Sequence, residues 1–123
     1  MPQRLQLSRK KGYKRPKGAV LVSRPSMWGN PYRIEPDRSI TKPFKYVVHD
    51  DDRKVSICCL YLEEARQVAV DLFKAYMRRE PMLRAAARTT LRGKDLLCWC
   101  PVGQPCHGDV LLAIANRGRK RAA

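Results

Sequence analysis

A stripe of apolar side chains through residues 60–79 constrains the fold of this chain more than any other feature. Its members recur at three- and four-residue intervals, the spacing of one face of an amphipathic helix. They are Leu62, Ala65, Val68, Ala69, Leu72, Phe73, Tyr76 and Met77. The same spacing returns between Pro81, a residue tolerated in a first helical turn, and Gly93, a common helix stop. We therefore expect two consecutive helices.

Short apolar runs lie on both sides of these helices. Residues 19–22 and 95–100 are apolar almost without interruption, as in strands buried on both faces of a sheet. Residues 44–50 and 53–60 indicate two more strands, and residues 109–116 indicate a last helix. This order predicts a small single α/β domain whose partly parallel sheet is packed by two or three helices.

The charge is concentrated at the two ends of the chain. Lys and Arg number 26 against 11 Asp and Glu, and residues 1–17 contain seven basic residues and no acidic one. The sequence predicts a flexible basic arm over residues 1–17, a domain over 18–116 and a basic tail over 117–123. Such termini suit DNA or RNA, bound through phosphates without sequence preference. The alternative is a pair of solubilising tails.

A cluster of metal-ligand side chains occupies ten positions near the end of the chain. Cys98, Cys100, Cys106 and His107 are ligand types that zinc prefers. The spacing is unusual, because zinc knuckles use two cysteines separated by two residues. The side chains of Cys106 and His107 also diverge unless the chain turns sharply. Zinc binding by these four residues is therefore one of three interpretations.

The second interpretation of this segment is a nucleophilic site. Cys106 precedes the predicted last helix, whose dipole would lower the pKa of its thiol. His107 would act as acid or base, Asp109 would orient it or cap the helix, and Gly108 would let a ligand approach the backbone. The third interpretation is structural, with the cysteines as small buried residues and Asp109 as a helix cap.

A second candidate element, the segment RPSMWGNP, directly follows the predicted strand over residues 19–22. Arg24 suits a phosphate, Trp28 offers a stacking face, Gly29 permits a turn with positive φ, and Asn30 can donate and accept hydrogen bonds. The alternative is a tight turn beside a core tryptophan. Both candidate elements follow predicted strands, and ligands in open α/β sheets bind at strand carboxyl ends. We therefore expect one pocket for a nucleotide-like or other phosphate-bearing ligand.

The sequence supports neither secretion nor insertion into a membrane. The start, MPQRLQLSRKK, lacks the apolar run of a signal peptide, and no stretch approaches the ~18 apolar residues of a membrane span. We expect a cytoplasmic protein without a membrane partner, whose cysteines are reduced.

The elements Trp28-Gly29-Asn30-Pro31, Cys98-Trp99-Cys100 and Cys106-His107-Gly108-Asp109 occur here in one order. In this combination the chain resembles a small family of phage and bacterial proteins catalogued only as a domain of unknown function. The resemblance covers about residues 18–116 and leaves out the basic termini. It implies a bacterial cytoplasm but no activity. Besides the pocket, two hypotheses remain: a zinc-stabilised nucleic-acid-binding module that is not an enzyme, and a phage protein that binds a host factor.

Overall fold

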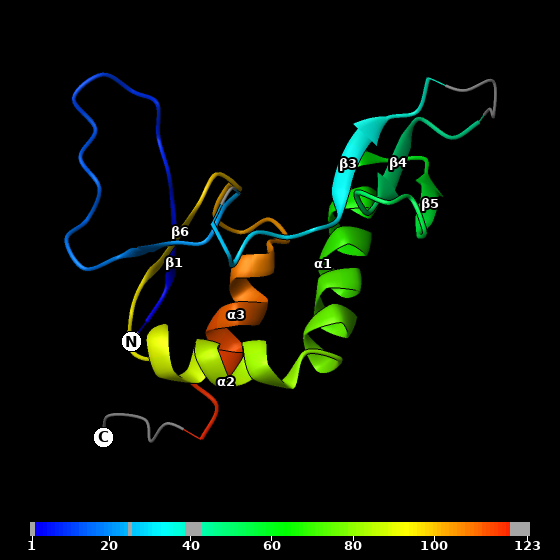
Figure 1. Cartoon of the computed structure of the whole chain (residues 1–123). Coiled ribbons are helices and arrows are strands. Elements are labelled where there is room, and N and C mark those ends of the chain that lie inside the picture. Colours follow the sequence, from blue (N-terminus) through cyan, green and yellow to red (C-terminus); the bar gives the residue numbers. More distant parts are fainter. Residues whose placement is uncertain (1, 25, 39–42, 119–123) are drawn as a thin grey trace.

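The computed structural model describes residues 2–24, 26–38 and 43–118, which form two three-stranded sheets and three helices (Figure 1). The elements in chain order are β1 (Arg4–Gln6), β2 (Val20–Leu21), β3 (Arg33–Pro36), β4 (Tyr46–His49), β5 (Ser56–Cys59), α1 (Leu62–Arg78), α2 (Pro81–Thr90), β6 (Leu96–Cys98) and α3 (His107–Ala115). The predicted α/β class is confirmed. None of the described helices has the length and apolar composition that crossing a membrane requires.

The first sheet is parallel and has β6 at its centre, between β1 and β2. Leu96 of β6 lies opposite Arg4 on one side and Val20 on the other. Leu96 and Leu97 are both buried, as the continuous apolar run predicts for a strand covered on two faces. Since all three strands run the same way, their carboxyl ends meet at one edge of the sheet.

The second sheet is antiparallel, in the order β3–β4–β5, and it packs against α1. The strands β4 and β5 lie where the sequence predicts them. The strand β3 was not predicted, because Gly29, Asn30 and Pro31 dominate its neighbourhood and suggest a loop. Its signal is the alternation of Tyr32 and Ile34, both of which pack into the core beneath this sheet.

The helix α1 spans both parts of the core. Its buried residues, Ala65, Ala69, Phe73 and Met77, follow one another at four-residue intervals, as the stripe predicts. Ala65 and Ala69 pack under the antiparallel sheet, whereas Phe73 and Met77 pack with α2, α3 and the parallel sheet. The helix α3 begins at His107, two residues before the predicted start, and Cys106 rather than Asp109 is its N-cap.

The prediction of a flexible arm over residues 1–17 is wrong for its beginning. Arg4–Gln6 form β1, and the amide of Leu7 donates a hydrogen bond to the carbonyl of Cys98 at 2.9 Å. Leu5 and Leu7 carry the strand signal, which the surrounding positive charge obscures in the sequence. Residues 8–18 are therefore a loop held at both ends by strands (Figure 1). Most of the predicted tail, residues 119–123, lies outside the described residues.

Leu7→Ala is expected to lower the free energy of unfolding by about 2–4 kcal/mol, because the 4 % exposed side chain would leave a cavity. Met82→Ala is the matched control, since that side chain in α2 is 82 % exposed. Urea denaturation of both variants measures the difference. A Leu7→Ala variant as stable as the control would support the prediction that this segment is a flexible arm.

Candidate metal centre and adjoining cavity

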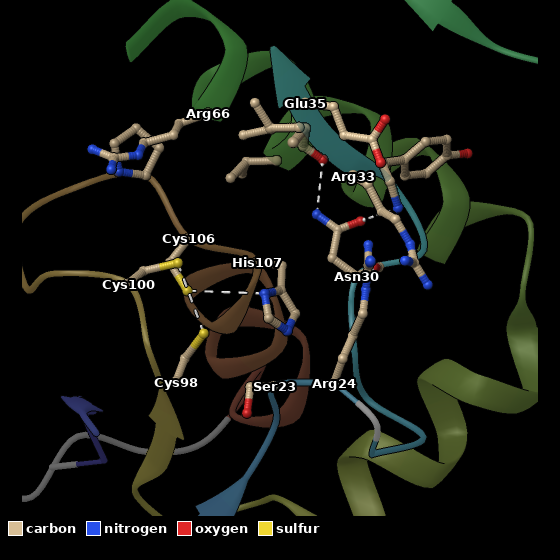
Figure 2. A pocket seen from close by; sticks show the side chains of 15 residues that line it. Ser23, Arg24, Asn30, Arg33, Glu35, Arg66, Cys98, Cys100, Cys106 and His107 are labelled. Atoms are coloured by element: carbon tan, nitrogen blue, oxygen red, sulfur yellow. Dashed lines mark hydrogen bonds between the residues drawn. The ribbon is translucent and has the colours of Figure 1, made fainter. Parts of the chain in front are cut away.

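Four predicted ligand residues gather at the carboxyl edge of the parallel sheet. Cys98 is the last residue of β6, and Cys100 follows it two positions later. The loop over residues 101–105 turns back so that Cys106 and His107 open α3 beside them (Figure 2). This loop brings residues from both of its ends together.

The sulfur atoms of Cys98, Cys100 and Cys106 all lie within 4.8 Å of one another. Cys98 Sγ and Cys100 Sγ are 3.8 Å apart, and the amide of Gly108 donates to Cys106 Sγ at 3.4 Å. Cys98 and Cys106 are buried and Cys100 is half-buried. Three thiols converging on one point can hold a metal ion.

His107 lies beside this cluster with one ring nitrogen already committed. Its Nε2 is 2.8 Å from the carbonyl oxygen of Val22, which only accepts hydrogen bonds, so Nε2 carries the proton. In the neutral ring, Nδ1 is then unprotonated, and it lies 3.9 Å from Cys106 Sγ. An edge contact with Phe73, at 5.2 Å between ring centroids, also fixes the imidazole. The lone pair of Nδ1 is therefore presented toward Cys106 Sγ, while His107 stays outside the group of three ligand atoms that lie within 4.8 Å of one another.

The close packing of the thiols separates their pKa values. Hydrogen bonds from Cys100 and Cys106 lower the pKa of Cys98. The bond with Cys106 lowers the pKa of Cys100, but the bond with Cys98, burial and the charge of Cys98 outweigh it and raise that pKa. Hydrogen bonds to Cys100 and Cys98, with burial, raise the pKa of Cys106. The expected lowering of the Cys106 pKa by the helix dipole is thus wrong. The Cys106 thiol donates hydrogen bonds to its neighbours, and these bonds favour its protonated form.

Arg4 supports the cluster from β1 and was missed by sequence reasoning. Its guanidinium donates to the carbonyls of Cys100 and Pro101 at 2.7 and 2.6 Å, and its side chain is 4 % exposed. A buried cation that bonds the backbone of the loop over residues 99–105 fixes the position of Cys100. In the sequence, Arg4 is one of seven basic residues, and only the alternation of Leu5 and Leu7 separates it from them.

Two predicted residues of the cysteine–histidine segment have other roles. Asp109 is 57 % exposed and lies 3.7 Å from Arg4 Nε, so it neither orients His107 nor caps the helix. Gly108 faces Arg4, since an added Cβ would lie 2.9 Å from the Arg4 Cδ. Glycine at this position thus makes room for Arg4. The role predicted for Asp109 is wrong.

The two candidate elements line one cavity of about 440 Å³, as the sequence predicts (Figure 2). The cysteine–histidine segment contributes Cys98, Cys100, Cys106 and His107, and the RPSMWGNP segment contributes Arg24 and Asn30. Sequence reasoning missed the other lining residues, among them Ser23, Arg33, Glu35 and Arg66, which come from the segment after β2, from β3 and from α1. They carry no local motif, and their meeting depends on the packing of α1 against both sheets.

Trp28 and Gly29 do not line this cavity. Trp28 is buried in the core with Phe73 and Leu96, so the alternative of a core tryptophan beside a tight turn is the correct one. Gly29 does not have a positive φ, and a Cβ there would lie 2.8 Å from Arg24 Cγ. The roles predicted for both residues are wrong, because the loop turns Trp28 inward and packs Gly29 against Arg24.

Asn30 joins its loop to the helix α1. Its side-chain nitrogen donates to the carbonyl of Ala69 at 3.2 Å, and its side-chain oxygen accepts from the amide of Tyr32 at 2.9 Å. The Arg24 Nε donates to the Asn30 carbonyl at 2.6 Å. Asn30 therefore both donates and accepts, as predicted, but within the protein. These bonds hold Arg24 at the cavity.

The cavity is lined by more positive than negative charge. Three guanidinium groups, of Arg24, Arg33 and Arg66, face one carboxylate, that of Glu35. Glu35 Oε2 lies 3.1 Å from His49 Nε2, and this contact is the main cause of its lowered pKa. Burial, with repulsion from Arg33, lowers the pKa of Arg24. Neither Arg24 nor Arg66 forms an ion pair within the part of the chain that the structure describes.

Binding of a divalent metal ion at these thiols is expected to weaken as the pH falls. The lowered pKa of Cys98 favours its thiolate, whereas the raised pKa values of Cys100 and Cys106 favour two thiols whose protons a metal must displace. Each displaced proton lowers the apparent affinity tenfold per pH unit, so two give about 100-fold. Titration with Co²⁺, followed by thiolate absorption at several pH values, measures this slope. An affinity independent of pH would contradict it.

The comparisons with known proteins agree with this domain organisation. Residues 5–117 match the family described as domain of unknown function (DUF4326), a range that includes most of β1 and of the basic stretch before residue 18. The expectation that the domain begins at residue 18 is therefore too short. No curated protein and no solved structure matches the chain. Because the match covers nearly its whole length, the chain belongs to the DUF4326 family.

Proposed function

We propose that this domain is a zinc-dependent binding module for a phosphate-bearing ligand such as a nucleotide. Cys98, Cys100, Cys106 and His107 would hold Zn²⁺, and the cavity beside them would accept the ligand. One observation supports both parts: the thiol cluster and three arginines line the same cavity. The proposal is one of binding, with no reaction attached to the site.

The spacing of the sulfur atoms suits zinc. A tetrahedral Zn²⁺ with Zn–S bonds of about 2.3 Å separates its sulfur ligands by about 3.8 Å. Cys98 Sγ and Cys100 Sγ are 3.8 Å apart, and Cys106 Sγ lies within 4.8 Å of both. Small rotations of these side chains would complete the tetrahedral arrangement.

His107 is the favoured fourth ligand. Metal-binding histidines usually donate their other N–H to a carbonyl or carboxylate, which fixes the tautomer. His107 makes this bond to Val22, and its free Nδ1 is 3.9 Å from Cys106 Sγ. A sphere closed by three cysteines and one histidine is typical of structural zinc sites. Cys106 and His107 would then be ligands and not a nucleophile with its base.

The cavity beside the centre suits an anion. A Zn²⁺ with three thiolates and a neutral histidine carries one negative charge, and Glu35 carries another that is shared with His49 and Arg53. Arg33 is paired with Asp51 at 2.9 Å, so the guanidinium groups of Arg24 and Arg66 are the ones without an ion-pair partner among the described residues. A phosphate group would pair with the guanidinium groups of Arg24 and Arg66.

The zinc part of the proposal predicts that Cys106→Ser loses the metal. Cys58→Ser is the matched control, because that thiol is exposed on β5 and lies outside the cluster. Wild type and Cys58→Ser are expected to contain about one equivalent of zinc, and its removal by a chelator should cost about 4 kcal/mol of stability for zinc at 1,000 times its Kd. Metal analysis and thermal unfolding measure both. Equal zinc in the two variants would refute the assignment.

The ligand part predicts that Arg66→Gln weakens binding of a nucleoside diphosphate about 10- to 100-fold, the loss of one charge-assisted hydrogen bond. Arg78→Gln is the control, since Arg78 is an exposed residue of the same helix outside this cavity. Calorimetric titration of zinc-loaded protein measures the affinities, with the uncharged nucleoside as a second control. Equal affinities in both variants, with zinc content unchanged, would contradict the ligand site but not the zinc site.

A further inference from the structure

The loop between β1 and β2 gathers positive charge in one place. Because β1 and β2 both run parallel to β6, the chain must return along the full length of the sheet between them. It does so as a projecting loop (Figure 1), in which residues 9–18 are all exposed. The loop contains no acidic residue and has six cations: Arg9, Lys10, Lys11, Lys14, Arg15 and Lys17. The cations thus lie on a segment held at both ends.

An exposed tryptophan lies next to the start of this loop. Trp99 is 42 % exposed, and the Arg9 guanidinium carbon lies 4.5 Å from the centroid of its ring. Trp99 and residues 6–9 line a surface hollow of about 510 Å³. The neighbours of Trp99, Cys98 and Cys100, line the other cavity instead, so this hollow lies on the opposite side of the chain. An aromatic face, a hollow and a run of cations therefore adjoin one another.

From this juxtaposition we infer that loop 8–18 and Trp99 form a binding surface for single-stranded nucleic acid. Loop cations would neutralise successive phosphates, and a base would stack on Trp99 in place of, or opposite, Arg9. The bases of a duplex are stacked inside it. A duplex would therefore bind the loop cations but would not stack on Trp99. An acidic polypeptide would likewise leave the ring without a stacking partner. Because every base has a stacking face, sequence preference should be weak.

This surface is independent of the phosphate-ligand cavity. The cavity lining includes neither Trp99 nor any residue of loop 8–18. The two proposals share only the position of Trp99 between two of the assigned zinc ligands. A variant of Trp99 therefore tests the surface without altering the arginines of the cavity.

The test is fluorescence anisotropy of a labelled oligothymidylate of about twelve nucleotides, a length within the usual site size, added to the full chain. Trp99→Ala is expected to weaken binding about 5- to 150-fold, the loss of one stacked base, and Trp99→Phe to restore part of it. Stacking should also quench tryptophan fluorescence, and the signal would come from Trp99, because Trp28 is buried.

The loop cations are tested by salt dependence. Lys10→Ala with Lys11→Ala should reduce the slope of log affinity against log salt by about 1.4, for two single-strand phosphates. The control pair, Lys74→Ala with Arg88→Ala, removes the same charge from exposed helical positions and should leave the slope unchanged. Equal binding by wild type and Trp99→Ala, equal slopes in the two pairs, or equal affinity for a duplex or for polyglutamate would each overturn the inference.

Discussion

Three sulfur atoms meeting within 4.8 Å of one another hold together the carboxyl edge of this domain. The chain brings them there by ending β6 at Cys98, turning through residues 99–105 and beginning α3 with Cys106 as its cap. Three thiols at this separation perturb one another's protonation, since one is favoured as thiolate and two as donors. A divalent cation would replace those protons with a stronger attraction.

Several neighbouring contacts have a common explanation if the cluster binds a metal. The bond from His107 to Val22 links α3 to the end of β2 and leaves one ring nitrogen available to the cluster. Arg4 links β1 to the carbonyls of Cys100 and Pro101. All three parallel strands therefore contribute a contact to this edge. The proposed nucleic-acid surface and the proposed ligand cavity lie on the two sides of it, so one centre would organise both.

The sequence predicts the regular elements better than the site, for physical reasons. Periodicity identifies α1, α2, β4, β5 and β6 because each buries one face or both. It misses β1, where Leu5 and Leu7 are separated by polar residues inside a basic run. Residue type alone suggests that Trp28 stacks on a ligand. Whether that side chain is exposed, however, depends on how its loop turns. The meeting of the two motifs was predictable from the rule that strand carboxyl ends coincide, whereas Arg33, Glu35 and Arg66 reach the cavity only through packing of α1 and β3.

The account rests on zinc bound by Cys98, Cys100, Cys106 and His107, and X-ray absorption at the zinc edge tests it most directly. Protein purified without chelator is predicted to give a shell of three sulfur atoms at about 2.3 Å and one nitrogen at about 2.0 Å. His107→Ala should replace the nitrogen by a light atom from solvent while keeping the sulfurs. Zinc surrounded only by oxygen and nitrogen, or protein that takes up no zinc, would contradict the account.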